Sequence, residues 1–185
     1  MLPRRGARTG PASNFRSTTL PGLRFPVKAP DVLFCRFLLT HLRSPHDALA
    51  VWAGIASANC TLLIHETETL ETDDPTLHRY YQLLAQLQQH YGQTLFVGRL
   101  LEQSLDGSGW RVIDDRRRAL EKPVARMAQL HLANLRTWRQ DDYALEAFDT
   151  AEIDALEASL SELSQDSAHG GMVTSGARQI IARRR

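Results

Sequence analysis

The order of apolar and polar residues from residue 31 onward separates strands from helices. Residues 31–39 form a near-continuous apolar run, which predicts a strand buried on both faces. Ser44 followed by Pro45 is typical of a helix start, and apolar residues then recur at helical spacing as far as Ile55. A second short apolar run, residues 60–65, predicts a second strand.

The same alternation continues toward the C-terminus. A helix is predicted after Asp73-Asp74-Pro75, with an apolar stripe along it and a stop at Gly92. A short helix then ends at the glycine-containing turn 106–109, and residues 110–113 predict a third strand. Residues 177–182 predict the last strand. This order of elements favours an α/β fold with mostly parallel strands.

A helical insert, residues 116–165, separates the last two predicted strands. Its first apolar stripe comprises Val124, Met127, His131, Leu135 and Trp138. A later helix of the insert is predicted to begin at Asp149, with Glu152 three residues further on, which fits a capping box.

The first thirty residues differ from the rest in charge. They hold six Arg or Lys residues and no Asp or Glu, so the remainder of the chain carries a net charge of −5. Five of the eight prolines also lie there, and we expect residues 1–22 to be an irregular leader. An Arg-rich, acid-free start also resembles an organellar transit peptide. Nucleic-acid binding is disfavoured, because only Phe15 and Phe25 accompany the basic residues.

Several classes of protein lack their sequence signatures here. No apolar run approaches the roughly 20 residues that span a bilayer, and two cysteines make no disulfide framework. There is no His-x-x-x-His or Cys-x-x-Cys pair for zinc, no Gly-x-Ser-x-Gly elbow, and no Gly-x-x-x-x-Gly-Lys phosphate loop. We therefore expect a cytoplasmic protein with no metal site and no membrane or nucleic-acid partner.

Two adjoining segments carry a family resemblance. Residues 31–42 are Asp-Val-Leu-Phe-Cys-Arg-Phe-Leu-Leu-Thr-His-Leu, and a helix then leads to Leu-Leu-Ile-His-Glu at residues 62–66. This pattern resembles the fourth and fifth strands of a class I S-adenosylmethionine-dependent methyltransferase. The resemblance covers about residues 23–185. It implies a partial doubly wound, Rossmann-like α/β sheet, mostly parallel with an antiparallel last strand, and a helical insert before that strand.

The resemblance also implies a function and a cofactor. S-adenosyl-L-methionine is the expected cofactor, and methyl transfer to a small molecule is the expected activity. Two family features are missing: the Gly-rich turn after the first strand and the acidic residue that ends the second. We therefore expect residues 23–185 to be a truncated methyltransferase-like domain, and both an active and an inactive copy stay open.

The resemblance assigns site residues near the end of the first predicted strand. It places Cys35, Arg36 and Phe37 beside the cofactor and His41 near the transferred methyl group, since ligands of doubly wound sheets lie beyond the carboxyl ends of the strands. The alternative for Cys35 and Phe37 is a place in the core, and for Arg36 an ion pair with an acid.

Two further groups are candidates for binding. In the resembled family the insert before the last strand often covers the substrate, which makes Met127, His131 and Trp138 candidates for the acceptor side. Their alternative is an ordinary helix core. The acidic stretch at residues 65–74 could hold a cation or supply a general base, and its alternative is a solvated loop with acids that favour a helix start.

A second hypothesis comes from a different class of function. The chain would be a non-catalytic interaction module derived from a methyltransferase domain. Without the strands that the family places beside it, the strand at residues 31–39 would form an open apolar edge, and such edges invite pairing. On this hypothesis a homodimer or a partner protein covers the edge, whereas the first hypothesis requires a small-molecule methyl acceptor.

Overall fold

The computed structural model describes residues 29–185, so the predicted leader, residues 1–22, lies outside the described residues. In chain order the elements are β1 (Val32–Arg36), η1 (Leu39–His41), α1 (Pro45–Ile55), β2 (Thr61–Glu71), α2 (Pro75–His90), η2 (Val97–Leu100), α3 (Leu101–Leu105), β3 (Trp110–Pro123), α4 (Val124–Trp138), α5 (Asp142–Ala147), α6 (Thr150–Gln165) and β4 (Met172–Arg184).

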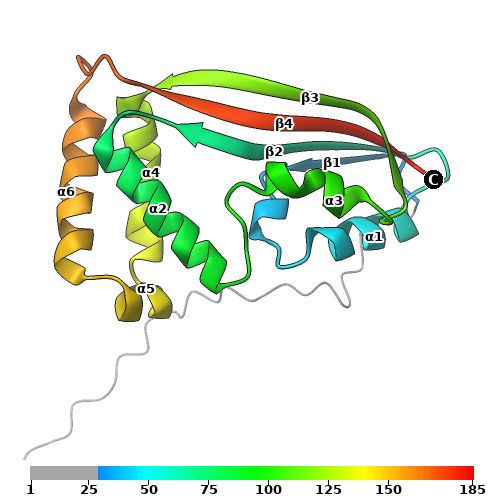
Figure 1. Cartoon of the computed structure of the whole chain (residues 1–185), viewed down its shortest axis with the longest axis horizontal. Coiled ribbons are helices and arrows are strands. Elements are labelled where there is room, and N and C mark those ends of the chain that lie inside the picture. The colour runs from blue at the N-terminus through cyan, green and yellow to red at the C-terminus, as the bar shows by residue number, and fades with distance from the viewer. Residues whose placement is uncertain (1–28) are drawn as a thin grey trace, which may run out of the picture.

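The four strands form one sheet in the order β1-β2-β4-β3 (Figure 1). β1 and β2 are parallel, whereas β4 is antiparallel to both of its neighbours, β2 and β3. β1, β2 and β3 therefore share one direction, and the last strand of the chain runs against them. The predicted fold class is confirmed: a mostly parallel α/β sheet with an antiparallel last strand and a helical insert before it.

Local sequence explains where the helices begin. The Ser44 hydroxyl accepts a hydrogen bond from the Asp47 N–H at the start of α1, and the Asp74 carboxylate accepts one from the Leu77 N–H at the start of α2. Asp149 caps α6 as predicted. The predicted capping box is only half formed, because Glu152 pairs with the Arg79 guanidinium of α2. Within residues 29–185, no helix combines the length and apolar character needed to cross a membrane.

Three of the four strands extend further than the apolar runs that predicted them, whereas β1 ends at Arg36, because the chain turns at Phe37 and residues 39–41 form η1. β2 continues to Glu71, β3 continues to Pro123, and β4 already begins at Met172. The insert therefore comprises residues 124–165, and the predicted start at residue 116 is wrong. The reason is that residues 116–123 pair with β4 as an edge strand whose side chains are mostly exposed, so burial imposes no apolar pattern on them.

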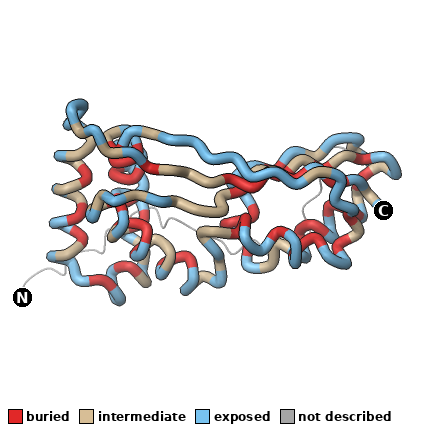
Figure 2. The backbone as a smooth tube through the Cα atoms, turned by 45° about the horizontal axis from the view of Figure 1, so that its top comes forward, coloured by how far each residue is buried: buried red, intermediate tan, exposed pale blue. Residues whose placement is uncertain are grey.

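The interior divides into two apolar clusters. The first lies between the sheet and α1, η2 and α3, and includes Leu49, Trp52, Leu62 and Ile180. The second joins the helices α2, α4, α5 and α6 beneath the far end of the paired strands β3 and β4, as the buried segments in Figure 2 show. Cys35 near the carboxyl end of β1 and Leu62 and Ile64 in the first half of β2 belong to the first cluster, so the core beneath α1 positions the end of β1 against β2.

β1 is not buried on both faces, contrary to the prediction. Cys35 points into the first cluster, whereas Val32 is 59% exposed and Phe34 is 67% exposed. The physical reason is visible in Figure 1: α1 lies on one face of the β1–β2 pair, and no helix of the described residues covers the other. Parallel strands are ordinarily covered on both faces, and the β1–β2 pair departs from that rule. We call its uncovered face, from which Val32 and Phe34 project, the bare face.

Candidate functional site

The carboxyl end of β1 turns sharply beside β2. Arg36 is the last residue of β1 and pairs with His65, and the Phe37 N–H donates to the His65 carbonyl at 3.0 Å. Phe37 then adopts a left-handed backbone with φ of 50°. A bulky residue in this region costs about 1 kcal/mol or more and persists only where its surroundings impose it. The turn therefore sets the direction of the following segment.

Glu66 holds the turn in place. Its Oε1 accepts hydrogen bonds from the backbone N–H groups of Leu38 and Leu39, both at 2.9 Å, where η1 begins. These N–H groups have no partner within the short helix, so the carboxylate satisfies them as a cap does. Glu66 is fully buried, and its Oε2 has no hydrogen-bond partner among the described residues.

Cys35 is a further hydrogen-bond donor to Glu66. Its thiol lies 3.4 Å from Glu66 Oε1 and donates to it, and the side chain is buried. Burial first, and then the charge of Glu66, raise the pKa of Cys35 to about 12. The thiol is therefore protonated at neutral pH and acts as a donor within the core.

The exposed residues Arg36 and Phe37 and the half-buried His65 form a cluster on the other side of the turn. The Arg36 guanidinium lies over the Phe37 ring, 4.9 Å from its centroid, and the Phe37 ring meets the His65 ring edge to face at 5.2 Å. Burial first, and then the charge of Arg36, lower the pKa of His65 below its usual value. The cluster thus offers an aromatic surface and a fixed positive charge at neutral pH.

His41 ends η1, in the segment that Glu66 anchors, and its side chain is exposed. The structure therefore gathers Cys35, Arg36 and Phe37 around one turn and leaves His41 one short helix away. Whether these four residues bind a cofactor stays a prediction. Glu66 is the residue whose role the sequence pattern did not show, because it stands within an acidic stretch and its burial follows only from the pairing of β2 with β1 and β4.

The candidate substrate residues Met127, His131 and Trp138 lie in the second apolar cluster, and all three are buried. His131 stacks on the Tyr80 ring at 4.4 Å, and its Nε2 is within hydrogen-bond distance of the Tyr81 hydroxyl at 3.1 Å. Burial, followed by the charge of Lys122, lowers the pKa of His131 to about 4. These contacts are those of a helix core, and a role in binding an acceptor stays a prediction.

The acidic residues in the stretch 65–74 make separate contacts and do not form one site. Glu66 anchors the turn after β1, Glu68 pairs with Arg117 of β3, and Asp74 caps α2. Within residues 29–185, no three His, Cys, Asp or Glu side chains are grouped so that they could hold a metal ion.

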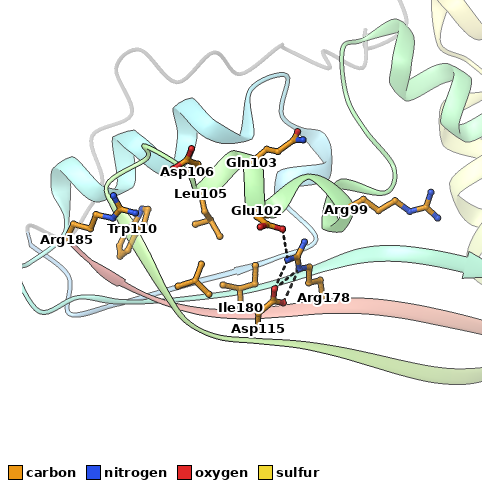
Figure 3. Close-up of a pocket in the computed structure, with 11 residues that line it drawn as sticks. Arg99, Glu102, Gln103, Leu105, Asp106, Trp110, Asp115, Arg178, Ile180 and Arg185 are labelled. Atoms are coloured by element: carbon orange, nitrogen blue, oxygen red, sulfur yellow. Dashed lines mark hydrogen bonds and ion pairs between the residues drawn. The ribbon is translucent and has the colours of Figure 1, made fainter.

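A cavity of about 670 Å³ lies between α3 and the sheet, where the sequence pointed to no site (Figure 3). Trp110, Leu105 and Ile180 form its apolar side, and the buried Arg178 lies at one end. Arg178 Nε donates to Asp115 Oδ1 at 3.0 Å, and Nη1 donates to the Gly98 carbonyl at 3.2 Å. The hydrogen bond from the Arg178 guanidinium lowers the pKa of Asp115.

The volume falls within the range of small-molecule sites. One sequence signal could have shown the cavity: an arginine stands two residues before Ile180, on the strand face that packs on the core. Its partner Asp115 comes from a distant part of the chain, so only the pairing of β3 with β4 brings the two together.

No family model matches the sequence, and no curated protein matches it. Solved structures of similar fold exist. The [4+2]-cyclase SpnF is 15% identical, with a TM-score of 0.45, and the match covers 88% of this chain and 52% of that one. A putative methyltransferase from Bacillus halodurans is 9% identical, with a TM-score of 0.49 and coverage of 86% and 73%.

The cyclopropane synthase MmaA2 from Mycobacterium tuberculosis is 17% identical, with a TM-score of 0.41 and coverage of 85% and 56%. One of these three solved structures, that from Bacillus halodurans, is described as a putative methyltransferase. The chain spans about half the length of SpnF and of this synthase.

Proposed function

We propose that residues 23–185 form part of an S-adenosylmethionine-dependent methyltransferase domain that acts on a small molecule. The observation that carries this proposal is the sheet itself. An antiparallel final strand lies between β2 and β3, and β1 ends beside the middle of the parallel strand β2, at a turn held by Glu66. That is the arrangement which the resemblance in residues 31–66 implies.

The residues of the turn fit one side of a bound S-adenosylmethionine. The exposed Phe37 ring presents an aromatic face, which suits an adenine ring or a sulfonium cation. Arg36 offers donors for a carboxylate group. Within residues 29–185, however, no strand leads into a Gly-rich turn that would let the backbone approach the ligand from the other side. We therefore propose a partial site with weakened affinity for the cofactor.

Methyl transfer requires little acid or base catalysis from the side chains of the protein. When bound, the cofactor supplies the methyl group, and transfer depends chiefly on holding the acceptor in line with it. In our proposal Arg36 and Phe37 orient the cofactor, and His41 accepts a proton from the acceptor at a ring nitrogen. Cys35 contributes by supporting Glu66, whose hydrogen bonds fix the turn.

Calorimetric titration of the full chain with S-adenosylmethionine tests this function. We expect saturable binding with a dissociation constant below 1 mM, roughly −4 kcal/mol or stronger. Phe37→Ala should weaken binding about fivefold, because an aromatic contact contributes about 1 kcal/mol. Leu145→Ala is the matched control, since Leu145 is an exposed apolar residue on α5. No binding at millimolar cofactor would refute the proposal.

The bare face of β1 favours the second candidate function, a non-catalytic interaction module. Val32 and Phe34 are both largely exposed, although they stand in the strand that the resemblance places within a larger sheet. This candidate requires no cofactor, so the same calorimetric titration separates it from the first.

A further inference from the structure

Arg178 presents a buried guanidinium at one end of the cavity between α3 and the sheet (Figure 3). Its Nε and Nη2 donate to the Asp115 carboxylate, and its Nη1 donates to the Gly98 carbonyl. A guanidinium has five N–H groups, two of them on each Nη atom. One N–H on Nη1 and one on Nη2 therefore find no acceptor within hydrogen-bond distance in residues 29–185, although the Arg178 side chain is only 6% exposed.

Glu102 approaches these unused donors without binding them. Its Oε2 lies 3.8 Å from Arg178 Nη2, beyond hydrogen-bond distance, and its side chain is 87% exposed. Figure 3 shows Glu102 and Asp115 on different sides of the guanidinium. The position beside Nη2 thus accommodates a carboxylate, and the carboxylate that the chain itself supplies there is free to turn out to solvent.

The charges around Arg178 favour one further negative charge. Arg99 lines the same end of the cavity, and its Nε donates to a backbone carbonyl, that of Glu68, rather than to a carboxylate. When Glu102 turns outward, Arg99 and Arg178 face the single carboxylate of Asp115. A singly charged carboxylate restores the balance and offers two oxygens to the unused donors, whereas a phosphate dianion would be repelled more strongly by Asp115.

An apolar surface lies beside Arg178 in the same cavity. Leu105, Trp110 and Ile180 are buried in its wall, and Val112, which is 43% exposed, adds a further apolar side chain. Trp110 Nε1 donates to the Leu49 carbonyl at 2.8 Å, so the indole ring is already fixed in its orientation. The volume of about 670 Å³ accommodates a ligand with one or two rings.

We propose that this cavity binds a small aromatic carboxylate, whose charged group replaces Glu102 at Arg178 and whose rings pack against Leu105, Trp110 and Ile180. Glu102 competes for the same donors and thereby sets the affinity. None of the residues assigned to the turn after β1 lines the cavity. The site therefore goes beyond the proposed methyl transfer, and it requires no cofactor.

NMR titration of the isotope-labelled full chain with naphthoate tests the site. We expect saturable shifts of the Trp110 indole N–H and Arg178 Nε–H signals, with a dissociation constant below about 1 mM. The indole signal of Trp138, which lies in the second apolar cluster, should stay unchanged. Naphthamide has the same rings without the charge and should bind at least about tenfold more weakly, because it offers no charge-assisted hydrogen bonds to Arg178.

Two substitutions should change the affinity for naphthoate in opposite directions. Arg178→Lys keeps a positive charge beside Asp115 but removes the planar pair of donors, and it should raise the dissociation constant at least about tenfold. Glu102→Gln removes the competing charge and should lower the dissociation constant about threefold. Glu121→Gln is the matched control, because Glu121 is an exposed acid on β3 that does not line the cavity.

Glu102→Gln alters an exposed side chain, so it keeps the proposal testable even if Arg178→Lys does not fold. Unchanged Trp110 and Arg178 signals at millimolar naphthoate, equal binding of naphthamide, or a Glu102→Gln chain that binds no more tightly than the wild type would each overturn the proposal. The titration contains no S-adenosylmethionine. A chain that binds naphthoate but no cofactor would therefore uphold this site and refute only the methyltransferase function.

Discussion

Single residues decide the shape of the candidate site. Arg36 and Phe37 could be assigned from the resemblance of residues 31–42, because an apolar strand that ends in a polar turn is visible in the sequence. Glu66 could not, since its meaning depends on burial. In the structure it joins β2 to the turn after β1 through the Leu38 and Leu39 N–H groups. A buried acceptor of this kind costs about 1–3 kcal/mol when it is removed.

Two substitutions of Glu66 should therefore distinguish the stability that comes from its hydrogen bonds from the stability that comes from its buried volume. Glu66→Ala leaves two N–H groups without an acceptor and opens a cavity, and the free energy of unfolding should fall by about 3 kcal/mol. Glu66→Gln retains a carbonyl oxygen for the same N–H groups and should cost about half as much or less. Urea denaturation measures both. Equal losses for the two variants would contradict the role of the hydrogen bonds.

His131 makes the helical insert sensitive to acid. Burial lowers its pKa in the folded chain from the usual 6.5 to about 4. Between these values the unfolded chain takes up a proton that the folded chain does not, so acid favours unfolding. The free energy of unfolding of the wild type should drop, relative to that of His131→Gln, by up to about 3 kcal/mol from pH 7 to pH 4. Parallel pH profiles for the two chains would show that His131 is not the source.

At the level of elements, the sequence predicted correctly the helices that have an N-cap or an apolar stripe with regular spacing. The N-caps Ser44, Asp74 and Asp149 begin helices as expected, and the apolar stripe of α4 is buried. It failed at the second half of β3, where Arg116 to Lys122 point mostly to solvent and the strand exists because β4 pairs with it. Long-range pairing of exposed residues leaves no periodic signal in one sequence.

The ion pair between Arg178 and Asp115 joins these two strands at the cavity. Asp115→Ala leaves the buried guanidinium without its carboxylate, and we expect a loss of about 2 kcal/mol, because Asp115 is itself partly exposed. The double variant Asp115→Ala, Arg178→Met removes both charges and should be more stable than Asp115→Ala alone. Thermal denaturation of the single and double variants gives the order. The reverse order would mean that the pair does not join the strands.

At the scale of the whole molecule, helices cover one face of the sheet and leave the other face exposed at β1. The clusters beneath α1 and within the helical insert give the described residues a genuine interior. The β1 edge and the bare sheet face do not share it. Sequence patterning predicted a strand buried on both faces, because apolar residues at Val32 and Phe34 look alike whether they meet a helix of the same chain or the surface of another molecule. This ambiguity is inherent in apolar runs.

We propose that the turn after β1 binds S-adenosylmethionine. Backbone amide NMR spectra recorded during titration with the cofactor test both binding and place. We expect saturable shifts for residues 36–41 and for His65 and Glu66, while the amides of α6 stay unchanged. Absence of shifts at millimolar cofactor, or shifts confined to the helical insert, would contradict it.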